Sequence, residues 1–415
     1  MTEAVQQLGL RQVLQIKEVR RLWMAQLVSV FGDFLVIFAV LSHASFDLRA
    51  TPAQITLIIV FFLVPYALIS PVVGVFVDRW NFKRTMIASD VVRAALVLLL
   101  VSSDNLNWIY AAFLLLSTVS TFFVPAQIVC IRVITPPEGL ISANALMQQA
   151  MQIVRIITPA LAGAMVAWFG AKPCYIIDCI SFLISATLIW SLRISGEPAA
   201  SATNGHTVGA VVADLMAGVK FIFTHAVLRF VILAMAVTVF ALSCVGPLIA
   251  IYVRDELKSS EFVFGIINSL LGIGMIVAML AISRFAQRRS KGQLILMGLF
   301  TMCGGILLMG VLIYVPSAAA GLFNIGLGGD IVLVSGLTII QAQTPAEMVG
   351  RVSGSLWSLM SIAQLPGLVL SGEIAKQIGI ANVFSCTAVV LGLIAILGLI
   401  RMPQAQMERT TATGS

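Results

Sequence analysis

The chain has 415 residues, of which 60% are hydrophobic and only 10% are charged, and its mean hydropathy is +1.03. Soluble proteins carry about 25% charged residues, so this composition excludes an ordinary water-soluble enzyme. The formal net charge is +7, but the basic residues lie mainly between apolar runs. This placement is typical of membrane topology and argues against a nucleic-acid partner.

Apolar runs of about 20 residues recur along the whole chain, and this length crosses a hydrocarbon core about 30 Å thick. Because lipid offers no hydrogen bonds to the backbone, each run is predicted to be a helix. We therefore expect an all-α integral membrane protein with twelve transmembrane helices. The predicted spans are 22–44, 53–77, 85–103, 107–131, 143–169, 173–193, 226–252, 261–284, 293–314, 317–341, 350–376 and 380–401.

A polar stretch between the sixth and seventh spans predicts how the chain is divided. Residues 194–210 form the longest polar segment inside the chain, and an amphipathic stretch follows at 211–223. The predicted parts are an N-terminal six-helix half (1–193), a cytoplasmic linker with an amphipathic helix (194–225), a C-terminal six-helix half (226–403) and a disordered tail (404–415).

The basic residues predict the orientation of the spans. With both termini in the cytoplasm, eighteen lysines and arginines fall on the cytoplasmic side and five fall outside. This distribution follows the positive-inside rule. We expect a multi-pass protein of the bacterial inner membrane with both termini cytoplasmic.

An internal repeat relates the two halves. Thr135-Pro136-Pro137-Glu138 recurs as Thr344-Pro345-Ala346-Glu347, an offset of 209 residues, and the same offset relates Gly170 to Gly379. Several matches in one register indicate two pseudo-symmetric six-helix halves. Halves related by an axis along the membrane normal are the plan of the major facilitator superfamily.

The charged loop between the second and third spans resembles the signature loop of that superfamily. The matching residues are Gly74, Asp78, Arg79, Lys83 and Arg84, and the departure is at Trp80-Asn81, where the signature has a glycine. The resemblance implies the major facilitator fold, in which spans one, four, seven and ten line a central cavity.

Within the superfamily the chain is most similar to the branch of macrolide-efflux and enterobactin exporters, the third drug:proton antiporter family. The similar features are Gly32-Asp33, residues 142–146, Asp178 followed by Ser181-Phe182, and residues 341–352. One feature differs: proton-coupled antiporters commonly carry an arginine midway along helix four, and residues 115–129 contain no basic residue.

Placing a charged side chain within the bilayer costs free energy, so each such residue is expected to have a functional or structural role. Three lie near the middle of a span, Asp33, Arg155 and Asp330, and the resemblance places Asp33 and Asp330 on the cavity. We expect these three to form the proton-coupling or substrate site, with Asp33 as the main acid and Arg155 as its ion partner. The alternatives are a static Asp33–Arg155 pair that fixes helix packing and a packing role for Asp330. Asp178 is expected near the outer surface, as a polar contact at the start of its helix.

The loop between spans two and three is expected to act as a conformational clasp on the cytoplasmic face. Negative charge is favoured at a helix N-terminus, so Asp78 can dock near the start of span eleven. Asp90 and Arg93, three residues apart, can extend this network. The predicted clasp comprises Gly74, Asp78, Arg79, Lys83, Arg84, Asp90, Arg93 and Arg351. The simpler alternative is that the loop only anchors the protein by its positive charge.

These patterns predict a secondary transporter that exports hydrophobic or amphipathic compounds, such as drugs or macrolides, in exchange for protons. One alternative is export of an endogenous cargo, namely a siderophore, a lysophospholipid or a divalent metal. Another is a membrane receptor or assembly factor without transport. No catalytic residues, no cofactor apart from the proton-motive force and no metal site are expected. The expected partners are a small-molecule substrate, protons and the lipid bilayer, and the protein is expected to be a monomer.

Overall fold

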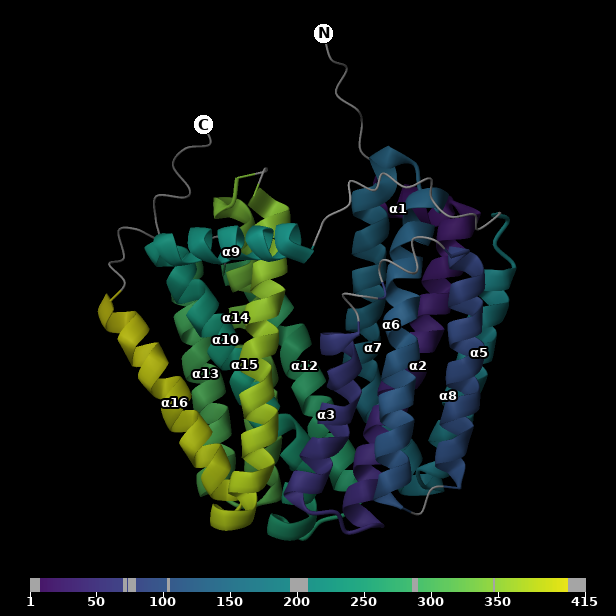
Figure 1. The fold of residues 1–415 in the computed structure, drawn as a ribbon. Coiled ribbons are helices and arrows are strands. Elements are labelled where there is room, and N and C mark those ends of the chain that lie inside the picture. Colours follow the sequence, from purple (N-terminus) through teal and green to yellow (C-terminus); the bar gives the residue numbers. More distant parts are fainter. Residues whose placement is uncertain are drawn as a thin grey trace. The chain divides into compact units, whose positions relative to one another are not determined.

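The computed structural model describes residues 8–69, 73, 80–102, 105–194, 208–285, 290–345 and 348–401. Every regular element in these ranges is helical (Figure 1). The chain divides into two compact units, and each is described separately. The first contains residues 1–50 and 57–202, and the second contains 51–56 and 203–415.

Among the described residues, the first unit contains seven α-helices and one 3₁₀ turn. They are α1 (Leu10–Gln15), α2 (Lys17–Phe46), most of α3 (Pro52–Leu68), α5 (Phe82–Val101), α6 (Leu106–Ile134), η1 (Pro137–Gly139), α7 (Leu140–Phe169) and α8 (Lys172–Trp190). Helix α2 packs against both α7 and α8, and α8 packs in turn against α5. Asparagine side chains cap the N-termini of two of these helices. The Asn81 side chain accepts a hydrogen bond from the Arg84 amide, and the Asn105 side chain accepts one from the Asn107 amide.

The second unit holds the remaining helices. They are α9 (Val208–Thr224), α10 (Ala226–Val245), η2 (Gly246–Leu248), α11 (Ile249–Ile251), η3 (Tyr252–Glu256), α12 (Glu261–Phe285), α13 (Lys291–Val311), α14 (Val315–Gln343), α15 (Val349–Ile378) and α16 (Ile380–Arg401). Helix α14 packs closely on both α12 and α13. Helix α9 crosses the ends of α10 and α15 (Figure 1), where Ile222 is buried and the Ser355 hydroxyl donates to the Leu215 carbonyl at 2.9 Å.

The helices follow the predicted spans closely. In the described part of the chain, nine helices are long and apolar enough to cross a membrane. Helix α3 is shorter, and α5 carries Lys83, Arg84, Asp90 and Arg93 within its 20 residues. The end of the second predicted span, residues 70–72 and 74–77, lies outside the described residues.

The internal repeat is visible in the helix ends. Helices α6 and α14 both have 29 residues and start 209 positions apart, and α7 and α15 both have 30 residues at the same offset. Gly170 and Gly379, which follow α7 and α15, have φ values of +77° and +85°. Glycine adopts this left-handed conformation without a Cβ penalty, so both helices end by the same device.

Exposed tryptophans mark both ends of the first unit. Trp108 begins α6 and Trp168 nearly ends the antiparallel α7, while Trp80 precedes α5 and Trp190 ends α8. Amphipathic rings at both ends of a helical bundle are typical of the two membrane–water interfaces. They mark the length of the bundle that lies within the bilayer.

Candidate functional site

Four charged side chains from three helices meet in the interior of the first unit. They are Asp33 on α2, Asp90 and Arg93 on α5, and Asp178 on α8, and we refer to them as the charge cluster. Asp90 and Arg93 lie one helical turn apart, so their side chains share one face of α5. Because α8 packs on both α2 and α5, it closes the cluster between them.

Arg93 is the centre of the cluster. Its side chain is only 4% exposed, its Nη2 donates to Asp90 Oδ1, and its Nη1 lies 3.8 Å from Asp33 Oδ2. The guanidinium also stacks between two rings, 4.7 Å from the centroid of Phe123 on α6 and 4.3 Å from that of Phe182 on α8. Aromatic faces stabilise a desolvated cation, so the two rings and the carboxylates together stabilise the positive charge of the buried Arg93 side chain.

The three carboxylates differ in exposure. The Asp90 side chain is fully buried and Asp178 is only 1% exposed, whereas 40% of the Asp33 side chain is accessible. Asp33 also lines a small cavity of about 20 Å³, room for one water molecule, together with Phe62, Phe113, Ser120 and Asp178. Asp33 is therefore the member of the cluster that a proton or a substrate can reach.

Gly32 lets α2 and α8 approach closely at this point. A Cβ atom at position 32 would overlap with the Asp178 carboxylate and the Ser181 hydroxyl. That hydroxyl donates to Asp178 Oδ1 at 3.0 Å and to the Asp178 carbonyl at 2.8 Å. The adjacent residues Gly32 and Asp33 thus place one acid beside another.

The cluster has three carboxyl groups and one guanidinium. Arg93 balances one of the three negative charges, and burial makes further unbalanced charge expensive. An arrangement with more acids than bases gains by binding a proton or another cation. Carboxyl groups in such positions mark proton relays and ion pathways in membrane proteins.

The predicted pairing of Asp33 with Arg155 is not tested by the described residues. The position of Arg155 near the middle of its span pointed to it as the partner of Asp33. Among the described residues, the ion partner of Asp33 is Arg93 on α5. Arg155 lies in α7, and its side chain is outside the described residues. Asp330 is buried in α14 of the second unit, so it belongs to a different unit from the charge cluster.

The sequence placed Asp178 near the outer end of its span, as a polar contact at the helix start. The structure adds that its side chain is almost completely buried beside Asp33, as part of the charge cluster. The signal was present in the sequence: Asp178, Ser181 and Phe182 share one helix face, and each contributes to the cluster.

The predicted clasp is only partly within the described residues. Gly74, Asp78 and Arg79 lie outside them, as does the side chain of Arg351. The Lys83 ammonium donates to the Leu192 carbonyl at 2.7 Å, beyond the end of α8 in the same unit. Asp90 and Arg93 form the predicted pair, and the structure joins this pair to Asp33.

Comparison with known proteins identifies the fold. The family model of the Major Facilitator Superfamily matches residues 22–365 and, in a second overlapping match, 231–415. The chain belongs to the major facilitator superfamily. It is accordingly a multi-pass membrane transporter with the superfamily's all-helical fold, and the resemblance noted in the sequence is confirmed.

Relatives with similar sequences include proteins of Bacillus subtilis and Streptococcus pyogenes. An uncharacterized transporter of Bacillus subtilis, YfiS, is 26% identical over 90% of this chain and 91% of its own length. Macrolide efflux protein A of Streptococcus pyogenes is 22% identical over 91% of this chain and 94% of its own length. Among solved structures, the nucleoside transporter NupG superposes with a TM-score of 0.72 at 12% identity, covering 93% of this chain and all of NupG, which supports the fold alone.

Proposed function

We propose that this protein exports hydrophobic or amphipathic compounds from the bacterial cytoplasm in exchange for protons, by alternating access. The two six-helix halves would rock about a central site, with both termini cytoplasmic and the protein acting as a monomer. The observation that carries the proposal is Asp33: an accessible acid in the middle of a span, 3.8 Å from a buried guanidinium.

The geometry suggests how a proton and a substrate compete for Asp33. Arg93 makes its direct hydrogen bond to Asp90, and its distance to Asp33 allows attraction without a normal hydrogen bond. Protonation of Asp33 therefore removes one charge of the cluster while Arg93 keeps its partner. Loss of that proton restores a negative charge on Asp33, 40% of whose side chain is accessible, and this charge would attract the cationic group of an amphipathic compound.

Arg93 also fills a role that the sequence left open. The arginine common in helix four of proton-coupled antiporters is missing here, since α6 has no basic residue before its last turn. Arg93 reaches the Phe123 face of α6 from α5 instead. We infer that the guanidinium is supplied by the neighbouring helix.

The similarity to macrolide efflux protein A supports export of large amphipathic compounds. The energy available is sufficient for this task. One charge moving through 100 mV supplies about 2.3 kcal/mol, which sustains a gradient of about 45-fold. The predicted clasp around Asp78 and Arg351 remains part of the proposal as the cytoplasmic latch between the halves.

The direct test is proton exchange in liposomes containing the purified protein and a pH-sensitive dye. Adding erythromycin, as a macrolide probe, should release protons from the wild-type protein. Asp33→Asn should lower both erythromycin exchange and its pH dependence at least tenfold. The matched control is Asp47→Asn, because Asp47 lies just beyond the same helix and its side chain is 56% exposed.

Three outcomes would count against the proposal. If Asp33→Asn keeps pH-dependent exchange, Asp33 does not couple protons and acts only in helix packing. If siderophores, lysolipids or divalent metals drive flux and macrolides do not, the cargo is endogenous. If no compound drives flux in either variant, the protein is a receptor or assembly factor.

A further inference from the structure

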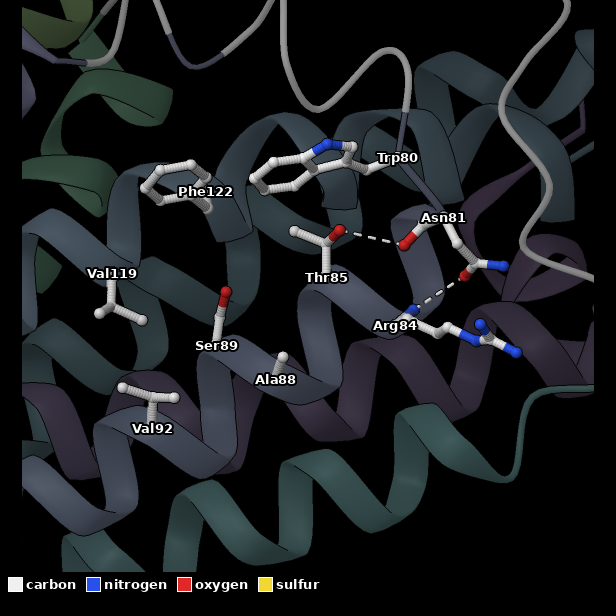
Figure 2. A pocket seen from close by; sticks show the side chains of 9 residues that line it. All are labelled: Trp80, Asn81, Arg84, Thr85, Ala88, Ser89, Val92, Val119 and Phe122. Atoms are coloured by element: carbon white, nitrogen blue, oxygen red, sulfur yellow. Dashed lines mark hydrogen bonds between the residues drawn. The ribbon is translucent and has the colours of Figure 1, made fainter.

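A groove separate from the charge cluster lies between α5 and α6 on the surface of the first unit. Its volume is about 650 Å³. Figure 2 shows the residues that line it: Trp80, Asn81, Arg84, Thr85, Ala88, Ser89, Val92, Val119 and Phe122. The groove is large enough to hold a substantial part of a lipid chain.

The groove changes from polar to apolar along its length. Arg84 and Asn81 lie at one end, and Val92 and Val119 lie at the other (Figure 2). Eight residues of α5 separate Arg84 from Val92, a rise of about 12 Å. The Trp80 ring stacks on Phe122 with centroids 5.9 Å apart and an interplanar angle of 6°. These two rings form an apolar wall beside the polar end.

The polar end carries an available positive charge. Of the two adjacent cations at the start of α5, Lys83 is engaged with the Leu192 carbonyl. The Arg84 side chain is exposed, and within the described part of the chain its guanidinium makes no ion pair. Tryptophan and arginine together at a helix end are typical of the membrane–water interface.

We propose that this groove binds an acidic phospholipid from the leaflet at the Arg84 end of the bundle. The headgroup phosphate would contact Arg84, and one acyl chain would lie along Ala88, Val92 and Val119. Charge complementarity selects an acidic lipid, because a zwitterionic lipid offers the same chains without net negative charge. The apolar end of the groove favours a lipid over a soluble phosphate, which has no chain to place there. The inference does not depend on the compound that is transported.

The test uses the fluorescence of Trp80 in protein reconstituted with brominated phospholipids. The protein has six tryptophans, so the Trp80 signal is the difference between wild type and Trp80→Phe. Brominated phosphatidylglycerol should quench this signal at about a fivefold lower mole fraction than brominated phosphatidylcholine. Arg84→Gln should abolish the difference. Arg132→Gln should retain it, because Arg132 is an exposed cation in the last turn of α6 that does not line the groove.

A second variant tests whether the chain enters the groove. Ala88 is exposed within it, so Ala88→Phe should fill the space without disturbing the core and should reduce quenching by both lipids. Equal quenching by the two lipids in the wild-type protein would overturn the proposal. The same is true if Arg132→Gln and Arg84→Gln have equal effects, or if neither lipid quenches Trp80.

Discussion

The Asp90–Arg93 pair is the part of the charge cluster whose removal from solvent costs the most free energy. Both side chains are almost completely removed from solvent, and Arg93 also serves Asp33 and two aromatic rings. A buried ion pair contributes little net stability relative to apolar residues, but removal of one partner leaves an uncompensated charge. The pair is therefore expected to be sensitive to single substitutions and tolerant of a double one.

We predict that Arg93→Gln lowers the free energy of unfolding by about 3–5 kcal/mol, because Asp90 loses the cation that pairs with it among the described residues. Asp90→Asn combined with Arg93→Gln removes both charges and should be markedly more stable than Arg93→Gln alone. Thermal unfolding in detergent measures both effects.

The control for this series is Arg132→Gln, since exposed substitutions usually change stability by less than about 0.5 kcal/mol. If Arg93→Gln melts at the wild-type temperature, or if the double variant is the less stable of the two, the pair does not hold the cluster together.

At the scale of helices, glycines in the second unit allow close contact between backbones. Gly326 and Gly328 on α14 face different neighbours: a Cβ atom at Gly326 would overlap with the Leu271 carbonyl on α12, and one at Gly328 with the Gly298 carbonyl on α13. In membranes, helices associate largely through such small residues. Gly329, on the same helix, has its nearest neighbour at 3.7 Å and leaves room for a methyl group.

Gly326→Ala is accordingly expected to separate α12 from α14 and to cost about 1–3 kcal/mol of stability. Gly329→Ala should be close to neutral, and it serves as the matched control because both substitutions add one methyl to the same helix. The melting temperatures of the two variants in detergent decide the matter. Equal melting temperatures would show that contact at Gly326 does not limit the packing of α14.

The sequence predicted the helices far better than the cluster between them. Hydrophobic length and the 209-residue repeat placed most described helix ends within a few residues, because both depend on local sequence. The exception is α3, which ends at Leu68 inside the predicted span 53–77. Membership of the cluster depends on the rotation of each helix about its axis. Depth along the span pointed to Arg155 and did not single out Arg93, which the packing of α5 on α8 places near Asp33.

At the scale of the whole molecule, the repeat gives each half the same helix plan, but the charge cluster belongs to the first unit. Asp330 lies one turn from Gly326 in a helix surrounded by close backbone contacts. The proposed division of labour is that the first half binds protons through Asp33. The second half, as described, is tightly packed through close backbone contacts of α14.

The orientation of this molecule in the membrane can be tested with two positions that flank α7. Arg132 ends α6, Lys172 begins α8, and both side chains are exposed. They lie on opposite sides of a single 30-residue span.

In a background with the six native cysteines replaced by alanine, Lys172→Cys should react with a membrane-impermeant maleimide in intact cells. Arg132→Cys should react only after the membrane is opened, because the positive-inside rule places it in the cytoplasm. The reverse labelling pattern would show that the protein has the opposite orientation in the membrane, with the Arg84 end of the groove outside the cell.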